Sequence, residues 1–185
     1  MAPTTLGKAL NMGLRKSMEE DAKVLIMGED VGKLGGVFRI TDGLQKDFGE
    51  DRVIDTPLAE SGIVGTAIGL ALRGYRPVCE IQFDGFVWPA YDQITAQLAK
   101  MHYRSQGRLR LPVVVRIPYG GGIGAVEHHS ESPEAYFVHT PGLRVVLHGL
   151  AQAHVDRLAE RGRRHVSDLP PRRRTRDRPH TCRGP

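Results

Sequence analysis

The chain has 185 residues, of which 40% are hydrophobic and 25% charged, an ordinary composition for a globular protein able to bury one full core. No apolar run approaches the roughly 20 residues of a membrane span, and the start of the chain lacks the apolar core of a secretory signal. We therefore expect a cytoplasmic protein with no membrane partner. Cys79 and Cys182 offer neither metal-ligand spacing nor a disulfide framework, so both are predicted to be free thiols.

The net charge of +5 is unevenly distributed. Residues 151–185 contain ten arginines, no lysine and four acidic residues, which gives this segment a charge of +6 and leaves residues 1–150 at −1. A basic surface that could bind an acidic partner is therefore expected only on the C-terminal segment, residues 151–185.

Apolar periodicity predicts helices that alternate with strands along the first 146 residues. The predicted helices cover 4–20, 44–48, 57–72, 88–104 and 134–139. The predicted strands cover 23–27, 53–55, 76–82 and 111–117, and another begins at 143–146. The nearly continuous β-branched run at 111–117 is typical of a central strand buried on both sides. This alternation predicts an α/β fold with a mainly parallel sheet and helices on both faces.

The helix predicted from residue 57 onward organises the rest of the chain. Thr56 is suited to cap its N-terminus and Pro57 to occupy its first position. The following apolar residues predict a helix buried almost all round. Its three glycines, at positions 62, 65 and 69, each cost about 1 kcal/mol relative to alanine, which indicates that another backbone comes close along that face.

Glu60 lies on the first turn of this helix and has two interpretations. The first is a role in an ion pair or with the helix dipole. The second is a functional acid, because apolar surroundings raise a carboxyl pKa and would let Glu60 share a proton with a ligand nitrogen near neutral pH. The loop that begins with Glu29 and Asp30 follows a predicted strand, so it is a candidate site, although a plain turn fits it equally.

His128 and His129 are adjacent, and on a regular element they point in different directions, so a shared metal is not expected. At most one of them is catalytic. The glycine-rich segment 118–124 lacks the lysine and hydroxyl residue of a P-loop, which makes it a weak phosphate site.

Seven short motifs together give residues 4–146 a specific resemblance. They are Gly28-Glu-Asp30, Asp55-Thr-Pro57, Glu60-Ser-Gly62, Glu80-Ile-Gln-Phe83, Tyr91-Asp-Gln93, His129-Ser-Glu-Ser-Pro-Glu-Ala135 and Pro141-Gly-Leu143. With them the chain resembles the β subunit of the E1 component of 2-oxo acid dehydrogenase complexes. The segments around Gln82 and His129 are more similar to the branched-chain group than to the pyruvate group.

The resemblance implies a thiamine-diphosphate pyrimidine-binding domain of the transketolase-like type. Glu60 matches the glutamate that bonds N1′ of the aminopyrimidine, Phe86 matches the aromatic residue that stacks on it, and Gln82 matches a position that lines the pocket. His129 matches the histidine implicated in acyl transfer as a general acid or base, whereas His128 has no such match.

The resemblance also implies partners. In this family the α subunit holds the diphosphate and Mg²⁺ through a motif that this sequence lacks. The active site would therefore form at the interface of a heterotetramer of two α and two β subunits. The implied reaction is oxidative decarboxylation of a 2-oxo acid with acyl transfer to the lipoyl-lysine of the E2 acyltransferase.

The family pattern stops after residue 146, which divides the chain into a pyrimidine-binding domain, 1–146, and an Arg/Pro-rich tail, 147–185. The second transketolase-type domain of the family is expected to be absent and the tail disordered. The tail is either a basic arm for nucleic acid or a translated wrong frame of a GC-rich gene, and we favour the wrong frame, without a nucleic-acid partner. The alternative function is a non-catalytic fragment that binds an α subunit or nucleic acid.

Overall fold

The structure is a computed structural model that describes residues 4–147. Its four strands form one sheet in the order β2-β1-β3-β4, and every neighbouring pair is parallel. The strands are β1 (Val24–Gly28), β2 (Val53–Asp55), β3 (Arg76–Glu80) and β4 (Val114–Arg116). The α/β class and the parallel sheet are therefore as predicted.

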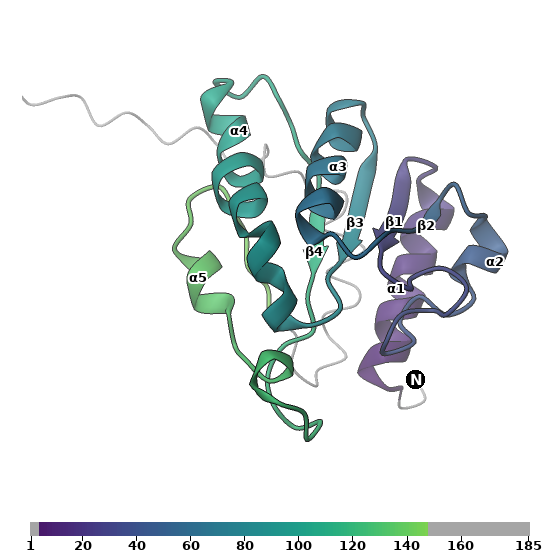
Figure 1. The fold of residues 1–185 in the computed structure, drawn as a ribbon. Coiled ribbons are helices and arrows are strands. Elements are labelled where there is room, and N and C mark those ends of the chain that lie inside the picture. Colours follow the sequence, from purple (N-terminus) through teal and green to yellow (C-terminus); the bar gives the residue numbers. More distant parts are fainter. Residues whose placement is uncertain (1–3, 148–185) are drawn as a thin grey trace, which may run out of the picture.

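Helices cover both faces of this sheet (Figure 1). All five residues of β1 are buried, and the first four, Val24–Met27, alternate between two apolar clusters. Val24 and Ile26 pack with Met18 of α1 (Leu6–Glu20) and Leu44 of α2 (Leu44–Phe48). On the other face, one cluster joins β1 to α3 (Glu60–Leu72) and consists of the buried residues Leu25, Met27, Ile63, Ala67 and Cys79. The core thus lies in two layers, one on either side of the sheet.

A third cluster lies between α3 and the helical segments of the second half of the described chain. Its buried members are Val64, Ile68, Ile81, Val87, Ala90, Ile94 and Phe137. Phe137 belongs to α5 (Glu134–Val138), so this cluster connects the last part of the described chain to Val64 and Ile68 of α3.

Helix α3 begins at Glu60, three residues later than predicted, with Ala59 at the N-cap position. The backbone N–H of Thr56 donates to the carbonyl of Gly28 at 2.9 Å, which extends the pairing of β2 with β1. Because that hydrogen bond keeps Thr56 extended, neither Thr56 nor Pro57 starts the helix. The first helical bond runs instead from Ile63 N–H to the Ala59 carbonyl.

The prediction that α3 is buried all round is also wrong for the described residues. Gly62 and Gly69 are exposed, and no backbone approaches them: the nearest atom to a Cβ at Gly62 would be Ala59 Cβ at 3.6 Å, and nothing lies within 4 Å at Gly69. A Cβ at Gly65 would meet only the Gln93 side chain, at 3.8 Å. The glycine face of α3 is thus uncovered at Gly62 and Gly69 in the described part of the chain, and only Gly65 is partly covered, by Gln93.

The helix predicted over 88–104 is a series of three different helical forms. A 3₁₀ segment, η1 (Asp84–Ala90), contains Pro89, and it is followed by a π-helical segment, η2 (Gln93–Leu98), and by α4 (Ala99–Arg104). In an α-helix the Pro89 ring would clash with the carbonyl four residues earlier, which disfavours the α-helical form of this segment.

Two strand predictions need correction. β4 covers only Val114–Arg116 and pairs with β3 alone, so it is an edge strand of the described sheet, and Val114 is 52% exposed. Residues 143–147 form no strand, although Leu143 and Val145 pack against the third cluster. The predicted tail, including Cys182, lies outside the described residues from position 148 onward. Among the described helices, none is long and apolar enough to cross a membrane, and the cytoplasmic location stays a prediction.

Candidate functional site

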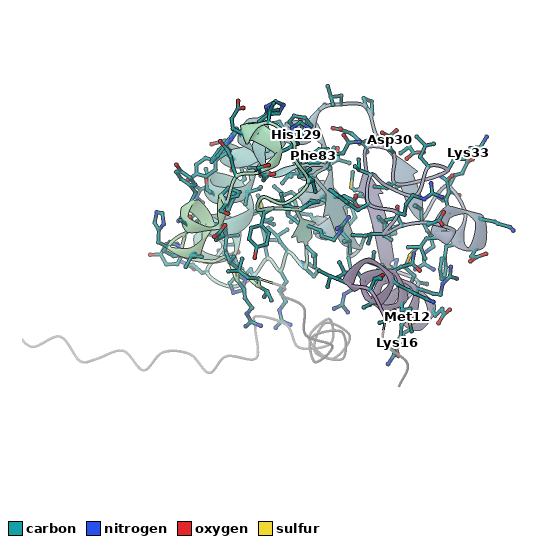
Figure 2. The ribbon with its side chains drawn as sticks, turned by 90° about the horizontal axis from the view of Figure 1, so that it is seen from below. Met12, Lys16, Asp30, Lys33, Phe83 and His129 are labelled. Atoms are coloured by element: carbon teal, nitrogen blue, oxygen red, sulfur yellow. The ribbon has the colours of Figure 1, made fainter. Side chains whose placement is uncertain are left out.

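The carboxyl ends of the strands gather the residues that the sequence singled out. The loop after β1 contributes Glu29 and Asp30, and the segment after β3 contributes Gln82 and Phe83. Figure 2 shows Asp30, Phe83 and His129 along one side of the molecule, whereas Met12 and Lys16 of α1 lie on the opposite side. The site therefore lies where parallel α/β sheets place their ligands.

Glu60 is the first residue of α3 and only 8% of it is exposed. Within residues 4–147 its carboxylate has neither an ion-pair partner nor a hydrogen bond, so the ion-pair interpretation is not met there. Its position on the first turn does place it in the field of the helix dipole. The carboxylate oxygens of Glu60 are not among the fully buried, unpaired polar atoms of the described chain, so a ligand can reach them.

A second buried carboxylate, Glu29, lies close to Glu60. Glu29 is 6% exposed, and its Oε1 atom is buried without a hydrogen-bond partner among the described residues. Burial raises the pKa of Glu29, and the charges of Glu60 and Asp30 raise it further. The two glutamates thus form an acidic pair at the base of the site. The sequence placed Glu29 in a candidate loop but did not reveal this pairing.

Gln82 is held at the mouth of the site by Asp30. The Gln82 Nε2 amide donates to Asp30 Oδ2 at 3.0 Å, which leaves the amide oxygen of Gln82 free for another donor. Asp30 has a φ of 57°, in the left-handed region that few residues other than glycine, asparagine and aspartate adopt. The hydrogen bond between Gln82 and Asp30 connects the loop after β1 to the segment after β3.

His129 lies within a cluster of aromatic rings. Its imidazole centroid is 4.0 Å from that of Phe83 and 5.2 Å from that of Phe86, in tilted and edge-to-face arrangements. The Nδ1 atom of His129 is buried without a hydrogen-bond partner in the described chain. His128 is exposed, and its Nδ1 lies 3.6 Å from the carboxylate of Glu127. The two histidines therefore differ in environment, as their adjacency predicts.

Below this cluster, a buried ion pair connects the last residues of β3 and β4. Arg116 pairs with Glu80, whose side chain is 2% exposed. The other carboxylate oxygen of Glu80 faces Gly36, where a Cβ would lie 3.0 Å from it. The pair fixes the strand ends from which Gln82 and Phe83 extend. No local sequence pattern indicates this ion pair, because the two residues lie 36 positions apart.

The structure thus brings His129 together with Phe86 and Phe83, and Glu60 together with Glu29. Helix α3, which begins at Glu60, packs against η1, which carries Phe86. Phe83 and Asp84 are further residues of this region that the sequence did not mark as site residues. Their position immediately after a buried strand was the available signal.

Comparison with known proteins gives the family of this domain. Residues 2–152 match the family described as "Transketolase, pyrimidine binding domain". The chain belongs to this family. The pyrimidine-binding domain also has a structural neighbour, a chain described as "Split gene transketolase, inactive beta4 tetramer", with a TM-score of 0.63 at 20% identity over 86% of this chain and 49% of that chain.

Curated relatives of this pyrimidine-binding domain are β subunits of 2-oxo acid dehydrogenases. The chain is 71% identical over 139 residues to "Pyruvate dehydrogenase E1 component subunit beta" of Leifsonia xyli, which covers 75% of this chain and 41% of the relative. It is 58% identical over 143 residues to "3-methyl-2-oxobutanoate dehydrogenase subunit beta" of Mycobacterium tuberculosis, a match that covers 77% of this chain and 41% of the relative. It shares 54% identity over 147 residues with "Pyruvate dehydrogenase E1 component subunit beta" of Bacillus subtilis, a match that covers 80% of this chain and 45% of the relative. The chain thus spans less than half the length of these relatives.

Proposed function

We propose that this domain supplies the pyrimidine-binding half of the active site of a 2-oxo acid dehydrogenase E1, as its β subunit. The reaction would be the oxidative decarboxylation of a branched-chain 2-oxo acid or pyruvate, with transfer of the acyl group to the lipoyl-lysine of an E2 partner. The names of the relatives support this reaction class, and they include both substrate groups. The observation that carries the proposal is the position of Glu60: this largely buried residue begins α3 beside Glu29, and its carboxylate forms no ion pair within residues 4–147.

The residues present fit the aminopyrimidine of thiamine diphosphate. Glu60 would share a proton with the ring nitrogen N1′, Phe86 would stack on the ring, and the free amide oxygen of Gln82 would accept a hydrogen bond at the pocket wall. When bound, thiamine diphosphate supplies the electron sink for decarboxylation. Glu60 is the first residue of α3 and lies beside a second acid, Glu29.

His129 would act on the acyl group as a general acid or base. Its ring is fixed by Phe83 and Phe86, and one ring nitrogen is buried without a protein partner. A general acid or base needs a fixed ring with an available nitrogen, and such a group contributes about 10²- to 10⁴-fold to rate. His128 is exposed and has no comparable fixed surroundings.

The diphosphate and its Mg²⁺ would be held by an α subunit. Within residues 4–147 no three His, Cys, Asp or Glu side chains are grouped so that they could hold a metal ion. The uncovered glycine face of α3 is the surface that such a subunit would cover. The complete unit would then contain two α and two β subunits.

The experiment that tests this function combines the full chain with the α-type subunit of the same organism, thiamine diphosphate and Mg²⁺. We expect calorimetric titration to show cofactor binding by the mixture but none by this chain alone. We also expect the mixture to decarboxylate a 2-oxo acid with a dye as electron acceptor. A mixture that binds no cofactor, or that binds it and turns over no 2-oxo acid, contradicts the proposal.

A further inference from the structure

The segment that carries His129 is attached to the end of β3 through a buried carboxylate. Asp84, which is 1% exposed, accepts a hydrogen bond from the backbone N–H of Glu131. The carbonyl of Glu131 in turn accepts from the backbone N–H of Gly120 at 2.7 Å. Glu131 therefore links both ends of the loop over residues 120–131 to a fixed point in the core.

Gly85 forms a second attachment by close approach. A Cβ at Gly85 would lie 2.7 Å from His128 Cβ and 2.8 Å from His128 Cα, distances that real Cβ atoms essentially never show. The φ of Gly85 lies outside the left-handed region, so alanine is allowed by the backbone, and the contact alone decides its cost. The absence of a side chain at Gly85 thus lets the histidine segment η3 (Glu127–His129) lie directly on η1.

The rest of this loop has few other attachments. Residues 121–128 are all exposed, and a Cβ added at Gly120, Gly121, Gly122 or Gly124 would meet nothing within 4 Å. A segment with so few contacts depends on its attachment points for its position. Asp84 and Gly85 lie in the same short stretch as Phe83 and Phe86, the two rings that contact His129.

We propose that Asp84 and Gly85 are positioning residues that set where the His129 ring lies relative to the pyrimidine pocket. This inference rests on the proposed function of His129 in acyl transfer. Asp84 fixes the loop through the Glu131 N–H, and Gly85 fixes how closely the loop backbone approaches η1. An ångström of misplacement can reduce the rate of a positioned step by about 10²-fold. The effect should fall on acyl transfer, because a methyl group at Gly85 would press on His128, beside His129, whereas Glu60 lies on a different element, α3.

The first test is hydrogen exchange of the full chain, read at peptides that cover residues 120–133. Gly85→Ala should speed exchange in these peptides at least several-fold, while peptides from β1 and β3 stay unchanged. The matched control Gly121→Ala adds the same methyl group to open space in the same loop, and it should leave exchange at the wild-type rate. If the peptides that cover residues 120–133 exchange at the wild-type rate in Gly85→Ala, the inference is wrong, whatever the activity of the enzyme.

The second test separates the two half-reactions in the chain paired with its α subunit. Gly85→Ala should reduce acyl transfer to a lipoyl domain by about 10²-fold, with dye-coupled decarboxylation within roughly twofold of wild type. Asp84→Leu should do the same, whereas Asp84→Asn, whose amide oxygen can still accept from the Glu131 N–H, should restore most of the transfer rate. Equal losses in both half-reactions, or no rescue by Asp84→Asn, contradict a positioning role.

The failures of the two proposals differ. A wild-type pair without any decarboxylation contradicts the proposed function, and the exchange experiment still decides whether Asp84 and Gly85 hold the loop. A wild-type pair that is active, with a Gly85→Ala variant that transfers acyl groups at the wild-type rate, contradicts this inference alone.

Discussion

The imidazole of His129 lies against the phenyl ring of Phe83, with ring centroids 4.0 Å apart and planes at 56°. The two residues are 46 positions apart in the chain. Phe83 directly follows Gln82, so one short segment after β3 supports both the pocket wall and the histidine. The position of the proposed acid or base is thus tied to the pyrimidine pocket by aromatic contact.

Replacing His129 by alanine should impair reductive acylation of the lipoyl group far more than replacing His128. The expected loss for His129→Ala is about 10²-fold or more, because a positioned general acid or base is removed. His128→Ala is the matched control, since it removes the same ring from an exposed position one residue away. Stopped-flow or mass-spectrometric detection of acylated lipoyl domain measures both rates. Equal losses in the two variants would reverse the assignment.

Removing Arg116 should destabilise the fold strongly. Arg116→Met leaves the Glu80 carboxylate, which is 2% exposed, without its charge partner, and the expected loss in unfolding free energy is about 3–5 kcal/mol. Adding Glu80→Gln to this variant should recover part of the loss, because the uncompensated charge is then gone. Urea unfolding of the full chain measures both values. A loss no larger than the roughly 1 kcal/mol of an exposed pair would show that the charge is not truly buried.

The acidic pair predicts how stability depends on pH. The pKa of Glu29 is raised from its ordinary value of 4.5, so the folded chain holds this proton more tightly than the unfolded chain does. The contribution of Glu29 is therefore most favourable below about pH 4.5 and is lost as the pH rises through the folded pKa. Glu29→Gln should raise the unfolding midpoint at pH 7.5 and change it little at pH 4.5.

The control for that prediction is Glu127→Gln, which removes an exposed carboxylate whose side chain is 81% accessible. It should alter the unfolding midpoint equally little at both pH values. Glu60→Gln should act in the same direction as Glu29→Gln, since it removes one of the charges that raise the Glu29 pKa. A midpoint for Glu29→Gln that falls at pH 7.5 would show that the glutamate is stabilising in its charged form.

Much of the fold was predictable because apolar periodicity is a local signal. The buried run of β1 and the short helix Leu44–Phe48 were predicted almost to the residue. The start of α3 was not, because the Thr56 N–H is taken by Gly28, a partner 28 positions away. The form of the helix after β3 was also missed, because Pro89 alters the backbone bonding of η1 in a way that apolar spacing does not reveal.

For the site, the residue types could be predicted and their pairings could not. Glu60, Gln82, Phe86 and His129 were identified from the sequence and the family resemblance, and their individual roles stay predictions. The acidic pair of Glu60 with Glu29, and the bond from Glu131 to Asp84, arise only when distant segments meet at the sheet edge. Such pairings depend on tertiary geometry, for which one sequence carries no local signal.

The measurement that tests the account most directly is hydrogen–deuterium exchange at C2 of thiamine diphosphate bound to the chain and its α subunit, followed by NMR. Glu60→Gln should retain cofactor binding but slow this exchange by about 10²-fold or more, because an amide cannot share the N1′ proton. Glu127→Gln, the exposed control, should exchange at the wild-type rate. Wild-type exchange in Glu60→Gln would contradict the central claim that the Glu60 carboxylate activates the cofactor.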